Sequence, residues 1–127
     1  MEADEFIQMV QESILDSNSK TFNEEDVLKT IQAILITLSE FLQPRQSQQL
    51  AATLPSDIGH YLIQNHINET ESLNDFFHCV AVREGTTLPR AIHHSRTVIA
   101  VLQEVVPAET LQKIKEQLPY EFAPLFQ

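Results

Sequence analysis

The side chains best suited to bind a metal or to transfer protons are five histidines: His60, His66, His78, His93 and His94. A zinc site on a helix needs ligands three or four residues apart, and a zinc knuckle needs a Cys-x-x-Cys pair. No two of these histidines have that spacing, and the chain has one cysteine. We therefore expect surface histidines and no metal site. A small metal-binding protein or an enzyme that uses the histidines is the alternative.

Cys79 follows His78, and His94 follows His93, in stretches with a helical pattern. Successive side chains on a helix point about 100° apart, so neither pair converges on one point. We expect Cys79 to be a buried structural thiol, because free cysteines are commonly buried. A single cysteine cannot form a disulfide within the chain, which fits a reducing compartment. The sequence thus predicts no catalytic residue and no cofactor.

The elements that would position these side chains are amphipathic helices, because apolar residues recur at intervals of three and four. Two glycines and no tryptophan argue against sheets and tight hairpins. The pattern predicts an all-α fold of about eight helices, over residues 3–16, 24–42, 44–54, 55–67, 72–85 and 87–106, with two more that begin at Pro107 and Pro119.

A short sequence motif, Leu-Pro followed by an acidic residue two positions after the proline, occurs twice. The two copies are Leu54-Pro55-Ser56-Asp57 and Leu118-Pro119-Tyr120-Glu121. The residue before a proline leaves the helical region, and a proline at the first helical position loses no hydrogen bond. Each copy of the motif therefore predicts the end of one helix and the start of the next. The offset of 64 residues also relates the apolar positions of the two halves. We predict a single domain, residues 1–127, formed by an internal duplication of about 3–67 and 72–126, as two pseudo-repeated lobes of one helical bundle.

The apolar stripe of the 24–42 helix has a counterpart in the helix that contains Pro89, where seven of eight positions stay apolar. Ser95 is the exception. We expect its hydroxyl either to bond a carbonyl oxygen one turn back or to fit a crowded helix crossing. His94 corresponds to Thr30, which lies on the polar face of the 24–42 helix.

Ile36 is an apolar residue on the side of the 24–42 helix opposite its stripe, and Ala33 lies on the same back surface. A central helix is often covered on two sides. We therefore expect either the 3–16 helix or a second copy of the protein to contact Ile36. Ala33 and Ile36 form the candidate interaction surface, and Ala100 with Val101 is apolar at the equivalent place in the second half.

The chain is acidic, with eight lysines and arginines against 18 aspartates and glutamates and a net charge of −10. Such a surface repels phosphate backbones and anionic lipids, so we expect no nucleic-acid or membrane partner, and it favours basic partners. The longest apolar run, Val98–Leu102, is too short to span a membrane. The N-terminus is acidic and lacks the basic start of a secretion signal. These features predict a soluble, cytoplasmic protein.

Several segments carry a family resemblance: Leu38–Leu42, Gln49–Pro55, Phe76–Val80, Val101–Val105 and Gln117–Pro119. Through them, nearly the whole chain resembles a bacterial family of helical proteins known as domain of unknown function 2267. The motifs are packing and capping signals, so the resemblance implies a helical fold. No activity is established for such proteins, so it implies no catalytic residues.

The function these observations favour is that of a non-enzymatic, helical protein–protein interaction module. Its partner would be either an unidentified protein or a second copy of the chain in a homodimer. Besides the histidine-based alternative above, an apolar ligand held between the lobes is a further alternative, because helical cores can house ligands.

Overall fold

The computed structural model describes residues 1–14, 23–63 and 72–126, and every regular element in these ranges is a helix. The elements are α1 (Ala3–Ile14), α2 (Glu24–Glu40), α3 (Pro44–Ala52), α4 (Ser56–Gly59), η1 (His60–Ile63), α5 (Leu73–Glu84), α6 (Leu88–Val105), α7 (Ala108–Gln117) and η2 (Tyr120–Phe126), where η marks a 3₁₀ helix. Because α4 continues directly into η1, the described ranges contain eight helical segments. The predicted all-α fold is confirmed.

The helices begin and end where local capping chemistry places them. Gly85 ends α5 with a φ of 71°, in the left-handed region that residues with a Cβ rarely adopt. The side chains that cap the N-termini of α2, α5 and α6, by accepting the backbone N–H three residues on, are Asn23, Ser72 and Thr87. Each lies at the start that the sequence predicts, so these boundaries follow from local interactions.

The two Leu-Pro corners separate helices as predicted, and both leucines are buried. The sequence predicts a helix that begins at Pro55. In the structure, Pro55 is the N-cap residue, and α4 begins one position later at Ser56. The helix that follows Pro55 is short, because α4 changes to 3₁₀ geometry at His60. The predicted ends of the 3–16 and 55–67 helices lie outside the described residues.

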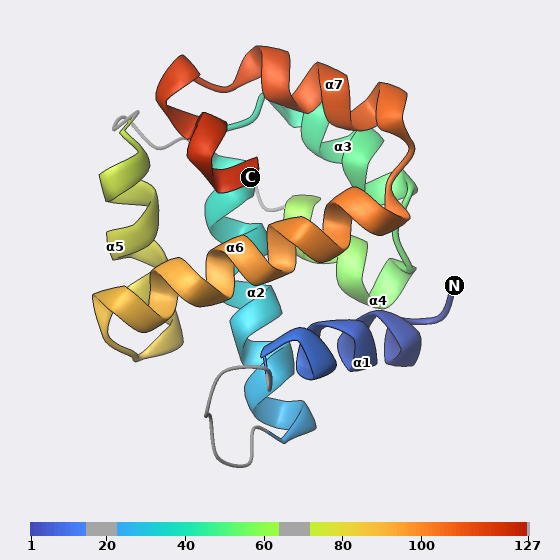
Figure 1. The fold of residues 1–127 in the computed structure, drawn as a ribbon. Coiled ribbons are helices and arrows are strands. Elements are labelled where there is room, and N and C mark those ends of the chain that lie inside the picture. Colours follow the sequence, from blue (N-terminus) through green and yellow to red (C-terminus); the bar gives the residue numbers. More distant parts are fainter. Residues whose placement is uncertain (15–22, 64–71, 127) are drawn as a thin grey trace.

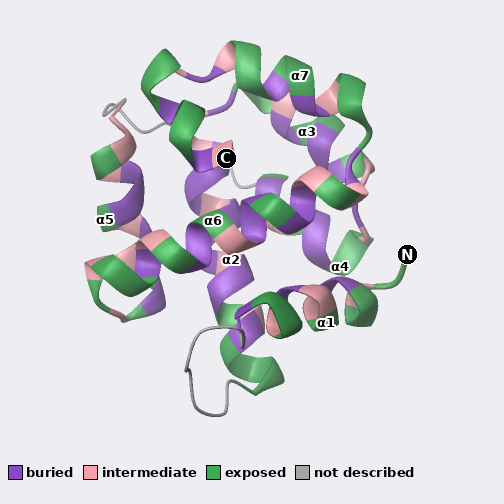
Figure 2. Cartoon of the chain, viewed as in Figure 1, coloured by how far each residue is buried: buried purple, intermediate pink, exposed green. Residues whose placement is uncertain are grey.

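Helix α2 lies at the centre of the fold, packed against α1, α5, α6 and η1. In Figure 1, α6 crosses α2, and Figure 2 shows that α2 is buried along most of its length. The rings of Phe41, Phe76 and Phe122 meet in the core, with centroids 5.2 to 5.9 Å apart. Both halves of the sequence therefore contribute to one cluster of buried apolar side chains.

The polar face predicted for the 24–42 helix is largely buried, which corrects the prediction. Thr30, Thr37 and Ser39 are buried, whereas Lys29 is exposed. The physical reason is that α5 and α6 pack against α2 in addition to the elements on its apolar stripe. The hydroxyls of Thr37 and Ser39 bond carbonyl oxygens of their own helix, so they can be buried without losing a hydrogen bond.

Candidate functional site

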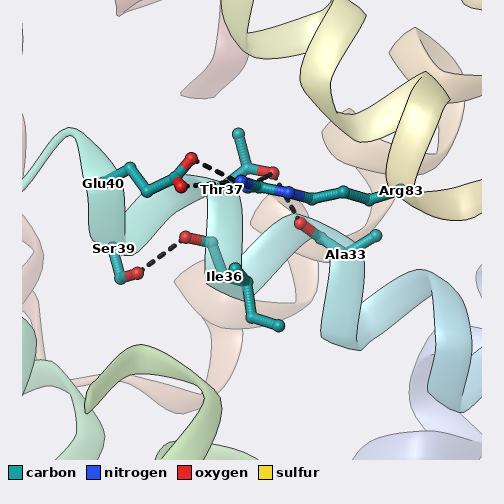
Figure 3. A network of polar contacts seen from close by, with 6 residues as sticks. All are labelled: Ala33, Ile36, Thr37, Ser39, Glu40 and Arg83. Atoms are coloured by element: carbon teal, nitrogen blue, oxygen red, sulfur yellow. Dashed lines mark hydrogen bonds and ion pairs between the residues drawn. The ribbon is translucent and has the colours of Figure 1, made fainter. Parts of the chain in front are cut away.

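The predicted surface of Ala33 and Ile36 lies on the central helix (Figure 3). Ala33 is only 3% exposed, so it offers almost no area to a partner. Ile36 is half-buried, while Ala100, its counterpart in the predicted duplication, is exposed. Figure 3 shows the Ile36 side chain pointing away from Arg83, which approaches α2 from α5. A contact between Ile36 and a second copy stays a prediction.

Arg83 joins α5 to α2 through a polar network next to Ala33. Its guanidinium donates to both carboxylate oxygens of Glu40, at 2.8 and 2.6 Å, and to Thr37 Oγ1 at 2.9 Å. The hydrogen bonds to Glu40 raise the pKa of Arg83 above its ordinary value. Thr37 in turn donates to the Ala33 carbonyl at 2.7 Å. Figure 3 shows this network, which holds two helices in register.

A second polar cluster, Thr30, Glu84 and His94, lies in the interior where α2, α5 and α6 meet. Thr30 Oγ1 donates to Glu84 Oε2 at 2.5 Å, and His94 Nδ1 lies 2.6 Å from the same oxygen. All three residues are buried, with Glu84 8% and His94 6% exposed. The prediction of a surface histidine is therefore wrong for His94. The sequence pattern carries no signal that singles out Glu84, because the partners that surround it come from two other helices.

This cluster does not have the arrangement of a nucleophilic site. A carboxylate bonded to Nδ1 orients an imidazole in many hydrolases, but there the nucleophile bonds the imidazole. Here the Thr30 hydroxyl bonds Glu84 instead. Glu84 Oε1 is buried without a hydrogen-bond partner among the described residues. The geometry therefore fits a structural role, in which hydrogen bonds to Glu84 join α2 and α6 to α5.

The other histidines are dispersed. His60, His78 and His93 are exposed, as predicted, and His66 lies outside the described residues. Cys79 is half-buried, so the expected fully buried thiol is wrong. Across residues 1–14, 23–63 and 72–126, no group of three or more histidine, cysteine or acidic side chains has a geometry that could hold a metal ion.

A pocket of about 290 Å³ opens at the C-terminal end of the chain, between the end of α7 and η2. Leu118 and Phe122 form a buried apolar floor, and Tyr120 at the rim is 95% exposed. The complete lining is Lys115, Leu118, Pro119, Tyr120, Phe122, Ala123 and Phe126. A buried apolar floor beside an exposed tyrosine is typical of a binding surface, since tyrosine is enriched among the residues that contribute most to binding.

The walls of this pocket are held by polar contacts to the rest of the fold. Gln103 on α6 donates to the Phe126 carbonyl at 3.1 Å, and the carboxylate of Glu121 accepts the backbone N–H of Leu73 at the start of α5. The ammonium of Lys115 lies 5.4 Å from the centre of the Phe126 ring, within cation–π range. Sequence reasoning missed this site because its residues carry the same apolar pattern as the core.

A family model described as "Uncharacterized conserved protein (DUF2267)" matches residues 3–125. No curated protein matches the sequence. Among the described residues, no helix is both long enough and apolar enough to cross a membrane.

Proposed function

The chain belongs to the DUF2267 family. We propose that it is a non-enzymatic module that binds a protein partner in the α7–η2 pocket. The observation that carries the proposal is the fully exposed Tyr120 beside the buried floor of Leu118 and Phe122. Hot spots of protein interfaces combine such an aromatic anchor with a desolvated apolar pocket.

The proposed duplication gives a physical reason why the pocket lies in the second half. An offset of 64 residues pairs Ala51 with Lys115 and Gly59 with Ala123. A Cβ added to Gly59 would lie 2.6 Å from the Ala51 carbonyl oxygen, so the first corner is closed by direct backbone packing. In agreement, η1 packs against both α2 and α3, whereas η2 packs mainly against α6. At the second corner the paired residues, Lys115 and Ala123, are both exposed, and they line the open space between α7 and η2.

The partner we propose is a different protein and not a second copy. Two copies with a net charge of −10 repel each other, whereas a basic partner is attracted. We also propose a reducing, cytoplasmic setting, because the sequence contains one cysteine, Cys79, which cannot form a disulfide within the chain. Sedimentation equilibrium tests the first point, and we expect the mass of a monomer over the accessible concentration range. A stable dimer would replace the proposed partner with the homodimer.

The experiment that tests the pocket is an NMR titration of the ¹⁵N-labelled protein with N-acetyl-phenylalanine amide, a neutral probe with one apolar side chain. We expect concentration-dependent shifts at the backbone amides of the lining residues, from Lys115 to Phe126. Ala123→Trp, at an exposed rim position, should fill the space and abolish the shifts. Ala100→Trp, at an exposed alanine on α6 outside the lining, is the matched control. Absent shifts in the wild type, or shifts that persist in Ala123→Trp, contradict the proposal.

A further inference from the structure

We infer that the group bound in the α7–η2 pocket is the C-terminal residue of the partner, with its apolar side chain against the apolar lining that includes Phe126 and its terminal carboxylate on the ammonium of Lys115. This inference rests on the proposed function, and it specifies the chemistry of the partner at that site. It follows from the charge at the rim, from the distance between that charge and the apolar wall, and from the openness of the pocket.

The first observation is the state of Lys115. Within the part of the chain that the structure describes, no carboxylate lies within ion-pair distance of its ammonium, which faces the Phe126 ring. The acidic residues that flank it in the sequence have other partners. Glu116 accepts a hydrogen bond from Gln112, and Glu121 accepts the Leu73 N–H. Among the described residues, this cation at the rim of an apolar pocket therefore faces no carboxylate, although the chain has a net charge of −10. An incoming anion would form a charge-assisted hydrogen bond with it.

The second observation is distance. Because Lys115 Nζ lies 5.4 Å from the centre of the Phe126 ring, a ligand that touches both must carry its anion close to its apolar group. A C-terminal residue meets this condition, since the side chain and the carboxylate are attached to the same Cα. An internal aspartate or glutamate meets it less well in an extended segment, because the adjacent side chain points to the opposite side and the side chain two positions on starts about 7 Å further along. Capture of a terminal carboxylate is a recurring mode of peptide recognition.

The third observation is the exposure of the rim. Lys115, Tyr120 and Ala123 are all exposed, so the pocket is open on one side. A small free acid would remain partly in water there, whereas small-molecule sites bury most of their ligand. A peptide covers the open side with its preceding residues. Since the rest of the surface is acidic, we expect those residues to be neutral or basic.

The test uses isothermal titration calorimetry with two peptides of sequence Gly-Ser-Lys-Ser-Phe, both acetylated at the N-terminus. One ends in a free carboxylate and the other in an amide. We expect the acid to bind about tenfold more tightly than the amide, because it adds a charge-assisted hydrogen bond. Lys115→Gln should remove this difference, and Lys115→Arg should largely restore it. The matched control is Lys113→Gln, an exposed lysine of α7 outside the pocket lining, which should leave the difference intact.

The outcomes separate the two proposals. Equal affinity for acid and amide overturns the inference and leaves the pocket as an apolar binding site. Failure of both peptides to bind, together with a negative NMR titration, overturns the proposed function itself. A third probe, 3-phenylpropionate, tests the other source of the same chemistry. If it binds as tightly as the acid peptide with the same dependence on Lys115, the pocket is a site for free carboxylates and the inference is wrong.

Discussion

Thr30 on α2 and His94 on α6 bond the same carboxylate oxygen, Oε2 of Glu84 on α5, at 2.5 and 2.6 Å. The two residues lie at equivalent positions of the proposed duplication, 64 residues apart. One acidic side chain in the interior therefore connects the two longest helices of the described structure to α5. Buried charged groups are stable only when they are paired and hydrogen-bonded, so this cluster makes the packing of three helices depend on all of its members.

Replacing Glu84 should destabilise the fold strongly. Glu84→Ala leaves the Thr30 hydroxyl and His94 Nδ1 without their acceptor in the interior, and we expect a loss of about 3 kcal/mol in the free energy of unfolding. Urea denaturation measures it. Glu104→Ala, at an exposed position of α6, is the control and should stay within about 0.5 kcal/mol of the wild type. His94→Ala should also be costly and His93→Ala should not. Equal stability of the two histidine variants would show that the cluster does not stabilise the fold.

The Leu-Pro corners should depend on their buried leucines. Leu54 is 8% exposed, so Leu54→Ala creates a cavity and should cost about 2–4 kcal/mol. Thermal and denaturant unfolding measure the loss. Val82→Ala removes methyl groups from a side chain that is 81% exposed, and it should change stability little. A melting temperature of Leu54→Ala within a degree of the wild type would contradict the packing described here.

Ser95 should tolerate the loss of its hydroxyl. The expected bond to a carbonyl one turn back is absent among the described residues, and Ser95 Oγ is buried without a partner. Ser95→Ala removes an unsatisfied polar atom, so the protein should keep its stability or gain up to about 1 kcal/mol. Thr37→Val is the contrasting variant, because Thr37 bonds both Ala33 and Arg83. If Ser95→Ala destabilises as much as Thr37→Val, the hydroxyl has a role that its surroundings do not explain.

Ile36→Glu tests the second face of the central helix. Ile36 is half-buried, so a charge there should lower the free energy of unfolding by about 1–2 kcal/mol at every protein concentration. Ala100→Glu, at the exposed equivalent position, should have little effect. Unfolding curves at two concentrations and sedimentation distinguish the results. A wild-type dimer that Ile36→Glu converts to a folded monomer would instead support an interface between copies at Ile36.

Gly59→Ala should separate α4 from α3. The added Cβ would lie 2.6 Å from the Ala51 carbonyl oxygen, a distance that backbone atoms can relieve only by shifting. We expect a loss of about 1–3 kcal/mol, as for other overpacked positions. Ser56→Ala, at an exposed position of the same helix, serves as the control. An unchanged melting temperature in Gly59→Ala would mean that the first corner is not closed by this contact.

The local features of this protein follow from the sequence alone. The side chains of Asn23, Ser72 and Thr87 cap their helices by accepting the backbone N–H three residues on. Gly85 ends α5 because it adopts a positive φ. The apolar stripe of the 24–42 segment has the helical period and is mostly buried, with Leu28 and Phe41 half-buried. These features are determined by the sequence because each depends on residues within one or two turns of the same helix.

The tertiary structure decided which polar residues are buried and where a pocket opens. His94 has the sequence pattern of a surface residue, but Glu84, ten residues away on another helix, meets it in the interior. Thr30 is buried because α5 and α6 cover the polar face of α2. The pocket opens between α7 and η2, whereas at the first Leu-Pro corner Gly59 packs directly against the Ala51 backbone. Such features escape the sequence pattern because they depend on how close whole helices lie, which periodicity does not encode.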